Sequence, residues 1–277
     1  MGVLENIVKE ASKLNKNIVL PEGEDSRVVI AASQAVKEGI ARITLLGNPE
    51  EIKAKNPDAD LSGVNVVDPA TFEKTPAYAE ILFKAREGKI NKKTGLPEYA
   101  DVNAAKAAIL KDHTMYGALM LKAGDVDGLV SGACHSTANT LRPGLQVIKT
   151  APGINTVSSC FIMIADRENK YNPDGVAVFA DCAINIEPDA QQLADIAIST
   201  AETAKNIALI EPRVAMLSFS TKGSGNDDKF FKSVPKMQEA TAIAKAAAPD
   251  LKLDGEFQFD AAVAPEVGKL KAPGSSV

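Results

Sequence analysis

The sequence has little of the material from which disulfide frameworks and zinc sites are built. Its 277 residues include only three cysteines and two histidines. Cys134, Cys160 and Cys182 are an odd number, lie far apart and form no CxxC pair, which argues against a disulfide framework and against a zinc site. The two histidines, His113 and His135, weaken a zinc ligand set further. We therefore expect no bound metal.

Long apolar runs and an excess of positive charge are also lacking. No stretch approaches the run of about eighteen apolar residues that a membrane span needs, and the first residues lack the layout of a signal peptide. The 36 acidic residues outnumber the 31 basic ones, for a formal net charge of −5. This balance argues against a nucleic-acid surface but permits a small anionic substrate. We expect a cytoplasmic protein that binds neither membrane nor nucleic acid.

Strand and helix patterns alternate through the first half of the chain. Short apolar runs at 18–20, 42–46, 64–67 and 127–131 are typical of buried strands, and helical patterns lie between them. A further helix is expected over 136–149. Such alternation predicts a mainly parallel sheet covered by helices on both faces.

The second half begins with a different pattern. Strand-like runs at 156–165 and 176–180 are separated by a turn at 172–175, which favours antiparallel pairing. An alanine-rich helix, a strand and another helix are then expected at 188–206, 214–219 and 228–247.

The length of the chain suits two domains rather than one. The segment Thr150-Ala-Pro-Gly153 interrupts the alternating pattern, so we place the boundary near residue 150. The expected fold is α/β, with a first α/β domain over 1–150 and a second over 151–277.

The strongest candidate for an anion site follows the strand expected at 127–131. Its glycine, hydroxyl and basic side chains are Ser131, Gly132, Ser136, Thr137, Thr140 and Arg142. Glycine lets backbone N–H groups approach a ligand, and a helix that begins near Ser136 would add the positive end of its dipole. The alternative is a capped helix after an ordinary loop, and the residues alone leave both open.

A second candidate loop, at 219–225, also follows an expected strand. Lys222 offers a charge, and Gly223 and Ser224 offer backbone donors. The chain has neither a Walker A loop nor a GxGxxG segment after a strand. Ligands of open α/β proteins collect at the carboxyl ends of strands, where both loops would lie, although a surface turn is an equally good interpretation here.

Three further residues have a structural as well as a functional interpretation. Arg86 ends a helix, where a basic side chain commonly complements the helix dipole. Asp181 ends a strand and would either lie near a cleft or cap a loop. Covalent catalysis by Cys134 beside His135 is disfavoured, because sequence neighbours seldom face each other as a catalytic pair.

Several segments, in this order along almost the whole chain, resemble the phosphate acetyltransferase family. They are Leu20–Arg27, Asp127–Ala133, Thr140–Pro143, Ile148–Gly153, Val157–Phe161, Phe179–Asn185, Gln192–Ala197, Ser218–Ser224 and Asp254–Ala261. The broader family also includes phosphate butyryltransferases and the C-terminal part of some malic enzymes. The amino-acid sequences of these segments are similar to those of the acetyltransferase members.

The resemblance implies two α/β domains of the isocitrate dehydrogenase-like class, with coenzyme A in the cleft between them. It further implies a homodimer that catalyses acetyl phosphate + CoA ⇌ acetyl-CoA + phosphate without a metal, a tightly bound cofactor or a covalent intermediate. Arg86 matches an arginine for the nucleotide phosphate, and Arg142 one for CoA or the acyl phosphate. We expect Arg142 and Ser131 to be catalytic. Substrate contacts are expected from Arg86, Gly132, Ser136, Thr137, Thr140, Asp181, Lys222, Gly223 and Ser224.

The sequence departs from the resemblance at its end. Family members continue beyond the equivalent of Val277 with a strand, helices and an Asp-Leu-Ser-Arg-Gly motif, which contains the proposed general-base Asp. We therefore expect a truncated form with weak or no activity and lowered stability. Two alternatives stay open, a metal-dependent NAD(P) hydroxy-acid dehydrogenase on a related fold and a non-catalytic protein that binds CoA or phosphate.

Overall fold

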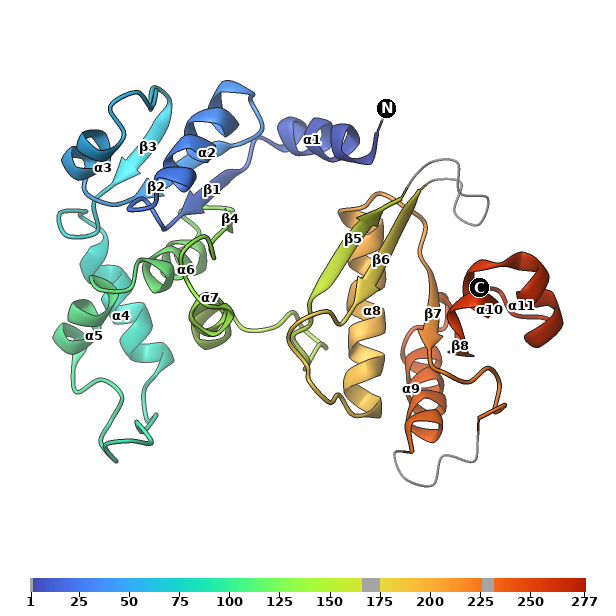
Figure 1. Cartoon of the computed structure of the whole chain (residues 1–277). Helices are drawn as coiled ribbons and strands as arrows, with labels where there is room; N and C mark the ends of the chain where they lie inside the picture. The colour runs from blue at the N-terminus through green and yellow to red at the C-terminus, as the bar shows by residue number, and fades with distance from the viewer. Residues whose placement is uncertain (1, 166–174, 226–231) are drawn as a thin grey trace. The chain divides into compact units, whose positions relative to one another are not determined.

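The computed structural model describes residues 2–165, 175–225 and 232–277. The chain divides into two compact units (Figure 1). The first, here the N-terminal unit, is Val8–Lys149. The second, here the C-terminal unit, is Thr150–Val277 together with Met1–Ile7.

A four-stranded parallel sheet forms the centre of the N-terminal unit. Its strands are β1 (Asn17–Leu20), β2 (Arg42–Leu46), β3 (Val64–Val67) and β4 (Gly128–Leu129), in the order β3-β2-β1-β4. Every pair in this sheet is parallel. The prediction of a mainly parallel sheet is confirmed.

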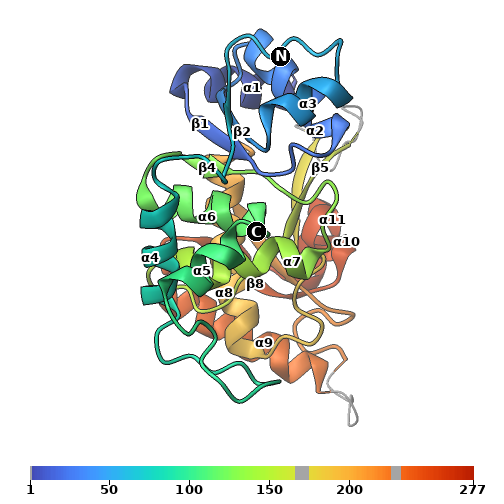
Figure 2. The ribbon, with the colours of Figure 1, turned by 90° about the vertical axis from the view of Figure 1, so that its left-hand side faces the viewer.

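Helices cover both faces of this sheet, because neighbouring residues of a strand point to opposite sides. Val19 packs on one face against α4 (Thr75–Ala85), α5 (Val102–Ile109) and α6 (His113–Ala123), which Figure 2 shows side by side. Leu20 packs on the other face against α2 (Ser26–Lys37) and α3 (Pro49–Lys55).

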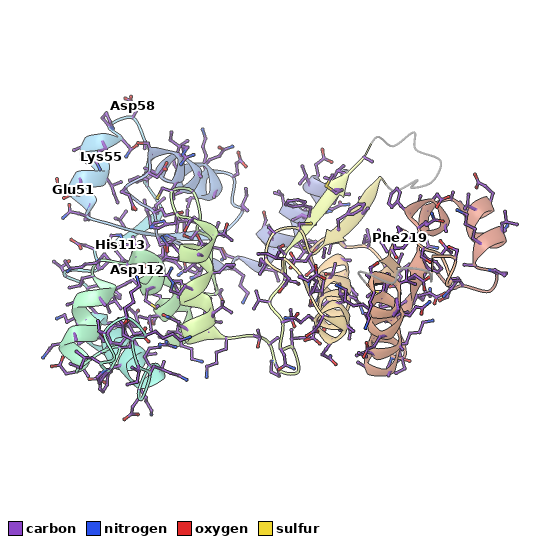
Figure 3. All side chains as sticks on the ribbon, turned by 60° about the horizontal axis from the view of Figure 1, so that its bottom comes forward. Glu51, Lys55, Asp58, Asp112, His113 and Phe219 are labelled. Atoms are coloured by element: carbon purple, nitrogen blue, oxygen red, sulfur yellow. The ribbon has the colours of Figure 1, made fainter. Side chains whose placement is uncertain are left out.

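Helix ends in this unit follow from local side-chain chemistry. Asp112 accepts a hydrogen bond from the N–H of Met115 at 2.9 Å, so α6 begins at His113 (Figure 3). The helix ends at Gly124, whose φ of 81° is a left-handed conformation that favours glycine.

The C-terminal unit contains two separate pairs of strands. Strands β5 (Cys160–Ile164) and β6 (Val176–Ala180) are antiparallel, as expected, with Phe161 opposite Phe179. Most of the turn expected at 172–175 lies outside the described residues. Strands β7 (Arg213–Leu217) and β8 (Lys252–Phe257) are parallel.

Alanines bring the two long helices of this unit close to its core. Helix α8 (Ala190–Asn206) contributes Ala194 and Ala197, and α9 (Ser233–Ala247) contributes Ala240 and Ala244. They pack with Met216 of β7 and Leu253 of β8. Two short helices, α10 (Phe259–Val263) and α11 (Pro265–Lys271), follow β8.

The helix expected over 136–149 is divided in the structure. Helix α7 (Thr137–Pro143) gives way to a π-helical turn, η1 (Gly144–Ile148). Pro143 lacks an N–H and cannot complete the ordinary ladder of hydrogen bonds, which explains why the helix changes character there. The helix expected at 228–247 starts at Ser233 in the part of the chain that is described.

The sequence analysis missed α1 (Val3–Leu14), α5, β8, α10 and α11. Strand β8 has Asp254, Gly255 and Glu256 in its middle, so it lacks the apolar alternation by which a strand is recognised. None of the helices within the described ranges is long and apolar enough to cross a bilayer.

Candidate functional site

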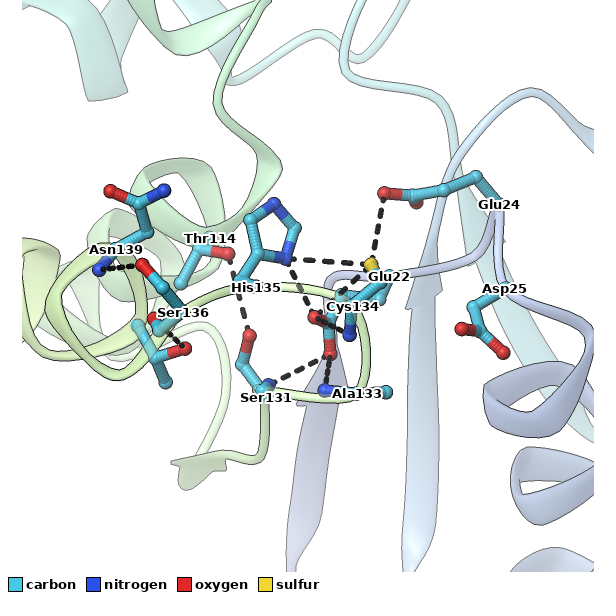
Figure 4. A network of polar contacts seen from close by, with 12 residues as sticks. Glu22, Glu24, Asp25, Thr114, Ser131, Ala133, Cys134, His135, Ser136 and Asn139 are labelled. Carbon is cyan, nitrogen blue, oxygen red and sulfur yellow. Dashed lines mark hydrogen bonds and ion pairs between the residues drawn. The ribbon is translucent and has the colours of Figure 1, made fainter.

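A buried glutamate occupies the loop that the sequence singled out as an anion site. Glu22 follows β1 and is 1% exposed. Its Oε2 accepts hydrogen bonds from the N–H groups of Gly132 at 2.9 Å and Ala133 at 3.0 Å. Its Oε1 accepts one from the N–H of Cys134 at 3.0 Å (Figure 4). Three consecutive backbone donors therefore enclose one carboxylate, an arrangement known as an anion nest.

Of the residues expected to bind an anion in this loop, only Gly132 contributes a donor to the nest, which is filled by the protein itself. Gly132 has φ +112°, a conformation that L side chains rarely adopt, and this turns its N–H toward Glu22. The backbone donors of Gly132, Ala133 and Cys134 already have an acceptor. A substrate anion at this loop must therefore be bound mainly by side chains.

His135 completes the surroundings of Glu22. Its Nδ1 lies 2.6 Å from Oε1. Burial raises the pKa of Glu22, but hydrogen bonds from the N–H of Cys134, from His135 and from the N–H of Ala133 outweigh burial and lower the pKa to about 2. Glu22 is therefore ionised at neutral pH and is a weak base.

The thiol of Cys134 lies beside the same carboxylate, with Sγ 3.3 Å from Oε1 of Glu22. Desolvation of the sulfur, its hydrogen bond to Glu22 and the negative charges of Glu22, Glu24 and Asp25 raise the pKa of Cys134 to about 12. A cysteine nucleophile must be a thiolate. The protonated state of Cys134 thus argues against covalent catalysis, as the sequence did.

The predicted hydroxyl residues of this loop lie close together around the start of α7. Ser136 caps the helix by accepting a hydrogen bond from the N–H of Asn139 at 3.4 Å, and Thr137 is its first residue. The Thr140 hydroxyl donates to the carbonyl of Ser136 at 3.1 Å. The hydroxyl oxygen of Ser131 lies 3.4 Å from that of Thr114, which comes from α6.

Arg142 is an exposed residue in the last turn of α7. Its Nη2 donates to Oδ1 of Asn139 at 2.8 Å. No carboxylate within the described ranges forms an ion pair with it. The guanidinium group therefore has both charge and donors to offer to an anion.

Arg86 differs from Arg142 because its charge is already paired. It caps the C-terminal end of α4, and its Nε and Nη2 donate to Oε2 of Glu98 at 3.0 and 2.6 Å. Both side chains are about one-fifth exposed. A phosphate at Arg86 must share the guanidinium with Glu98 or replace that carboxylate.

In the C-terminal unit, Asp181 caps a loop. Its carboxylate accepts hydrogen bonds from the N–H groups of Ala183, Ile184 and Asn185 at 2.9, 3.1 and 2.9 Å, and from the Ser159 hydroxyl. Burial raises the pKa of Asp181, but these hydrogen bonds hold it well below its usual range. The sequence left two roles open for Asp181, a position near a cleft or a loop cap. Its contacts are those of a loop cap.

The loop around Lys222 is also tied to a buried carboxylate. Gly223 donates its N–H to Oε1 of Glu256 at 2.6 Å, and Glu256 is 1% exposed. Lys222 itself donates to Oδ1 of Asp254 at 2.8 Å, the same oxygen that Lys245 reaches at 2.6 Å. Two ammonium groups thus share the Asp254 carboxylate, and the ionised Glu256 carboxylate in the same loop balances the second positive charge.

Ser224 takes part in the internal bonding of this loop, because its hydroxyl oxygen accepts a hydrogen bond from the N–H of Thr221 at 3.1 Å. The predicted residues of this loop and Asp181 belong to the C-terminal unit, whereas Arg86 and the residues from Ser131 to Arg142 belong to the N-terminal unit.

A hydroxyl-lined pocket of about 220 Å³ in the C-terminal unit was not anticipated. Its hydroxyl groups come from Thr150, Thr156, Ser158, Ser159, Ser199, Thr200 and Thr203. These residues belong to segments about 40 residues apart in the sequence, so no local sequence motif predicts the pocket. Glu22 was missed as well, although a glutamate directly after a buried strand was a signal that could have found it.

Comparisons with known proteins give a consistent result. The family described as "Phosphate acetyl/butaryl transferase" matches residues 2–277. A phosphate acetyltransferase of Thermoanaerobacterium thermosaccharolyticum is 46% identical over 277 residues, which are all of this chain and 80% of that protein. One of Bacillus subtilis is 46% identical over 262 residues, which are 94% of this chain and 74% of that protein.

Solved structures agree with these sequences. The EutD phosphotransacetylase of Staphylococcus aureus is 38% identical with a TM-score of 0.85, over 99% of this chain and 78% of that one. A phosphotransacetylase of Streptococcus pyogenes is 42% identical with a TM-score of 0.86 over the same shares. A family match along nearly the whole chain and these identities show that the chain belongs to the phosphate acetyl/butyryl transferase family.

Proposed function

We propose that this chain transfers an acetyl group reversibly between coenzyme A and phosphate, with acetyl phosphate as the other substrate. The observation that carries this proposal is the 46% identity to a phosphate acetyltransferase over all 277 residues. It favours acyl transfer over both alternatives, the dehydrogenase and the non-catalytic binding protein. A dehydrogenase of the kind considered would also need clustered carboxylates for its metal. The one potential metal-ligand group found in the described part of the chain contains a single carboxylate.

The reaction sets two chemical demands. The thiol of coenzyme A has a pKa of about 8.5, so a base must take up its proton at neutral pH. The thiolate then forms a bond to the carbonyl carbon of acetyl phosphate, and the bond from that carbon to the phosphate oxygen breaks. Negative charge develops on the carbonyl oxygen and on the leaving phosphate, and both need fixed donors.

Arg142 is the residue that we propose for the acyl phosphate. Its exposed guanidinium lacks a carboxylate partner among the described residues, so a phosphate would meet an uncompensated charge. Ser131, at the other end of the same loop, would donate its hydroxyl to the reacting group. The hydroxyls of Ser136, Thr137 and Thr140 supply further donors around the start of α7.

The remaining predicted residues have different roles in this proposal. Arg86 would bind a phosphate of the CoA nucleotide, with Glu98 released or shared. Lys222, with Gly223 and Ser224, would bind a second anionic group through its ammonium group, which is 38% exposed. Gly132 shapes the loop, and Asp181 holds a loop in place instead of meeting an anionic substrate.

A general base has to take up the proton of the CoA thiol. Glu22 and Asp181 both have lowered pKa values and filled hydrogen-bond positions, so neither is suited to take a proton from a thiol. Supply of the base by residues beyond Val277 stays a prediction.

We also propose a homodimer in the cytoplasm. The face of the β5–β6 pair that carries Phe161, Met163 and Phe179 is exposed, at 57%, 49% and 38%. Exposed apolar patches of this kind mark interaction surfaces, and a second copy of the chain is the partner that the family resemblance implies. The three free cysteines suit a reducing compartment.

The proposed reaction is tested by following thioester formation from acetyl phosphate and CoA in the presence of a chelator. The chain should be compared with a version extended by the C-terminal segment of a relative. We expect activity that needs no metal in the extended protein, and a rate at least about tenfold lower in the 277-residue chain, since a general base contributes about 100-fold or more. A folded extended protein that forms no thioester would contradict the proposal.

Replacing Arg142 tests its role in that active protein. Arg142→Ala should lower kcat/KM by about 100-fold, because a charge-assisted donor to the developing anion is lost, and Arg142→Lys should restore part of it. Arg42 offers a matched control, since it is an exposed arginine at the opposite, amino-terminal end of β2. Equal losses in Arg142→Ala and Arg42→Ala would argue against the assignment.

The proposal that Glu22 positions the loop predicts a pH dependence of stability. The folded pKa of Glu22 is about 2 against an ordinary value of 4.5. Its stabilisation, about 3 kcal/mol, should be fully present above pH 4.5 and be lost as the pH falls toward 2. Urea unfolding should therefore show a steeper loss between pH 5 and pH 2 for the wild type than for Glu22→Gln. Glu24→Gln, an exposed neighbour, should behave as the wild type; parallel profiles for all three would contradict this role.

The dimer surface is tested by sedimentation equilibrium. Phe161→Glu should weaken self-association at least tenfold, because a charge would be buried in an apolar contact. Leu96→Glu is the control, since Leu96 is 65% exposed and belongs to the N-terminal unit. A monomeric wild type, or equal effects of both changes, would contradict the surface.

A further inference from the structure

Three side chains with metal-binding atoms, those of Glu22, Cys134 and His135, converge beside the loop after β4, and Glu24 lies next to Cys134 (Figure 4). Cys134 Sγ lies 3.3 Å from Oε1 of Glu22, 3.5 Å from Nδ1 of His135 and 3.8 Å from Oε1 of Glu24. The ligand atoms of Glu22, Cys134 and His135 all lie within 4.8 Å of one another. A thiol, an imidazole and carboxylates are the donor set that zinc prefers.

The spacing of these atoms fits tetrahedral coordination. Metal distances of about 2.3 Å to sulfur and about 2.0–2.2 Å to nitrogen and oxygen place neighbouring ligand atoms about 3.3–3.7 Å apart. The three separations from Sγ agree with this range to within about 0.1 Å. There are two exceptions. The 2.6 Å hydrogen bond from His135 Nδ1 to Glu22 has to open by less than about 1 Å. The exposed Glu24 side chain, which contacts Cys134 but lies outside the group of ligand atoms within 4.8 Å of one another, has to turn toward the other ligands. The His135 side chain is 30% exposed, which leaves it room to move.

Glu22 is already oriented as a metal ligand would be. Its Oε2 is fixed by the N–H groups of Gly132 and Ala133, and Oε1, which accepts the N–H of Cys134, is the oxygen that faces Cys134 Sγ and His135. Hydrogen bonds of this kind commonly orient the carboxylates that bind metals. The nearby positive charge of Arg27 is offset by Asp25, with which it forms an ion pair at 2.6 Å.

We propose that Cys134 Sγ, His135 Nδ1, Glu22 Oε1 and Glu24 Oε1 form a binding site for a thiophilic divalent cation of the zinc class. Binding replaces the thiol proton of Cys134, which is released to solvent, and the proton on Nδ1 of His135 leaves or moves to Nε2. No electron is transferred. The expectation that the chain has no metal site rested on spacing along the sequence, which cannot show that Glu22 and Glu24 lie beside Cys134.

Cobalt(II) is the probe of choice, because tetrahedral cobalt absorbs strongly in the visible range and a thiolate ligand adds a charge-transfer band in the near ultraviolet. The full chain should be titrated with Co²⁺ without oxygen and with a phosphine reductant. We expect both bands to saturate at one equivalent, to disappear when Zn²⁺ is added, and to be accompanied by release of at least one proton. Saturating Zn²⁺ should also raise the thermal unfolding temperature.

Variants separate this site from adventitious binding. Cys134→Ser should abolish the charge-transfer band, while Cys160→Ser, the same change at a cysteine outside the cluster, should retain it. His135→Gln should weaken metal binding at least tenfold, and Glu24→Gln, a change at an exposed side chain, should weaken it several-fold. If Cys134→Ser does not fold, these two variants test the proposal. Absence of the thiolate band in the wild type, or its persistence in folded Cys134→Ser, would overturn the proposal. The readout is independent of transferase activity.

Discussion

The hydrogen bonds that the Glu22 carboxylate accepts from the backbone N–H groups of residues 132–134 determine the shape of the candidate site. An ionised carboxylate that is 1% exposed would strongly destabilise the fold without partners. Glu22 has three backbone N–H groups and an imidazole. Since β1 and β4 are parallel neighbours, their carboxyl ends lie at the same edge of the sheet, and a glutamate that follows one strand reaches the loop that follows the other.

The same arrangement recurs in the C-terminal unit. Asp181 accepts three consecutive backbone N–H groups after β6, and Glu256 of β8 accepts the N–H of Gly223 after β7. In the loops after β4 and β7, an acidic side chain is bound where a substrate anion was expected from the sequence. These loops are held by internal hydrogen bonds, and we propose that anion recognition falls to side chains such as Arg142 and Lys222. This proposed division of roles would let an acidic protein act on anionic substrates.

Much of the fold could be predicted because the signals are local. The apolar runs of β1, β2 and β3 and the turn chemistry around them indicate buried parallel strands, and the sheet confirms this. Helix α7 was drawn too long because Pro143 was not weighed as an interruption. Strand β8 was not predicted, because its acidic residues are stabilised by partners far away in the sequence, such as Lys222 for Asp254. Membership of the isocitrate dehydrogenase-like class stays a prediction.

The candidate site was predictable only in part, for a related reason. Glycine after a strand correctly indicated a nest of backbone donors at Gly132, but the sequence could not show which anion fills it. Glu22 is 110 residues away from Gly132, and only the pairing of β1 with β4 brings them together. The contacts of Cys134 with Glu22 and Glu24 likewise cannot be predicted from the spacing of residues along the sequence.

Amide hydrogen exchange at Gly132, Ala133 and Cys134 tests the central claim most directly. These residues are exposed, so their amides should exchange at nearly the rate of an unstructured peptide unless Glu22 accepts their hydrogen bonds. The account predicts exchange slowed by about 100-fold or more in the wild type, and near-peptide rates in Glu22→Ala, which has no side-chain acceptor. Unprotected amides in the folded wild-type protein would contradict it, because the loop would then be held by something other than the buried carboxylate.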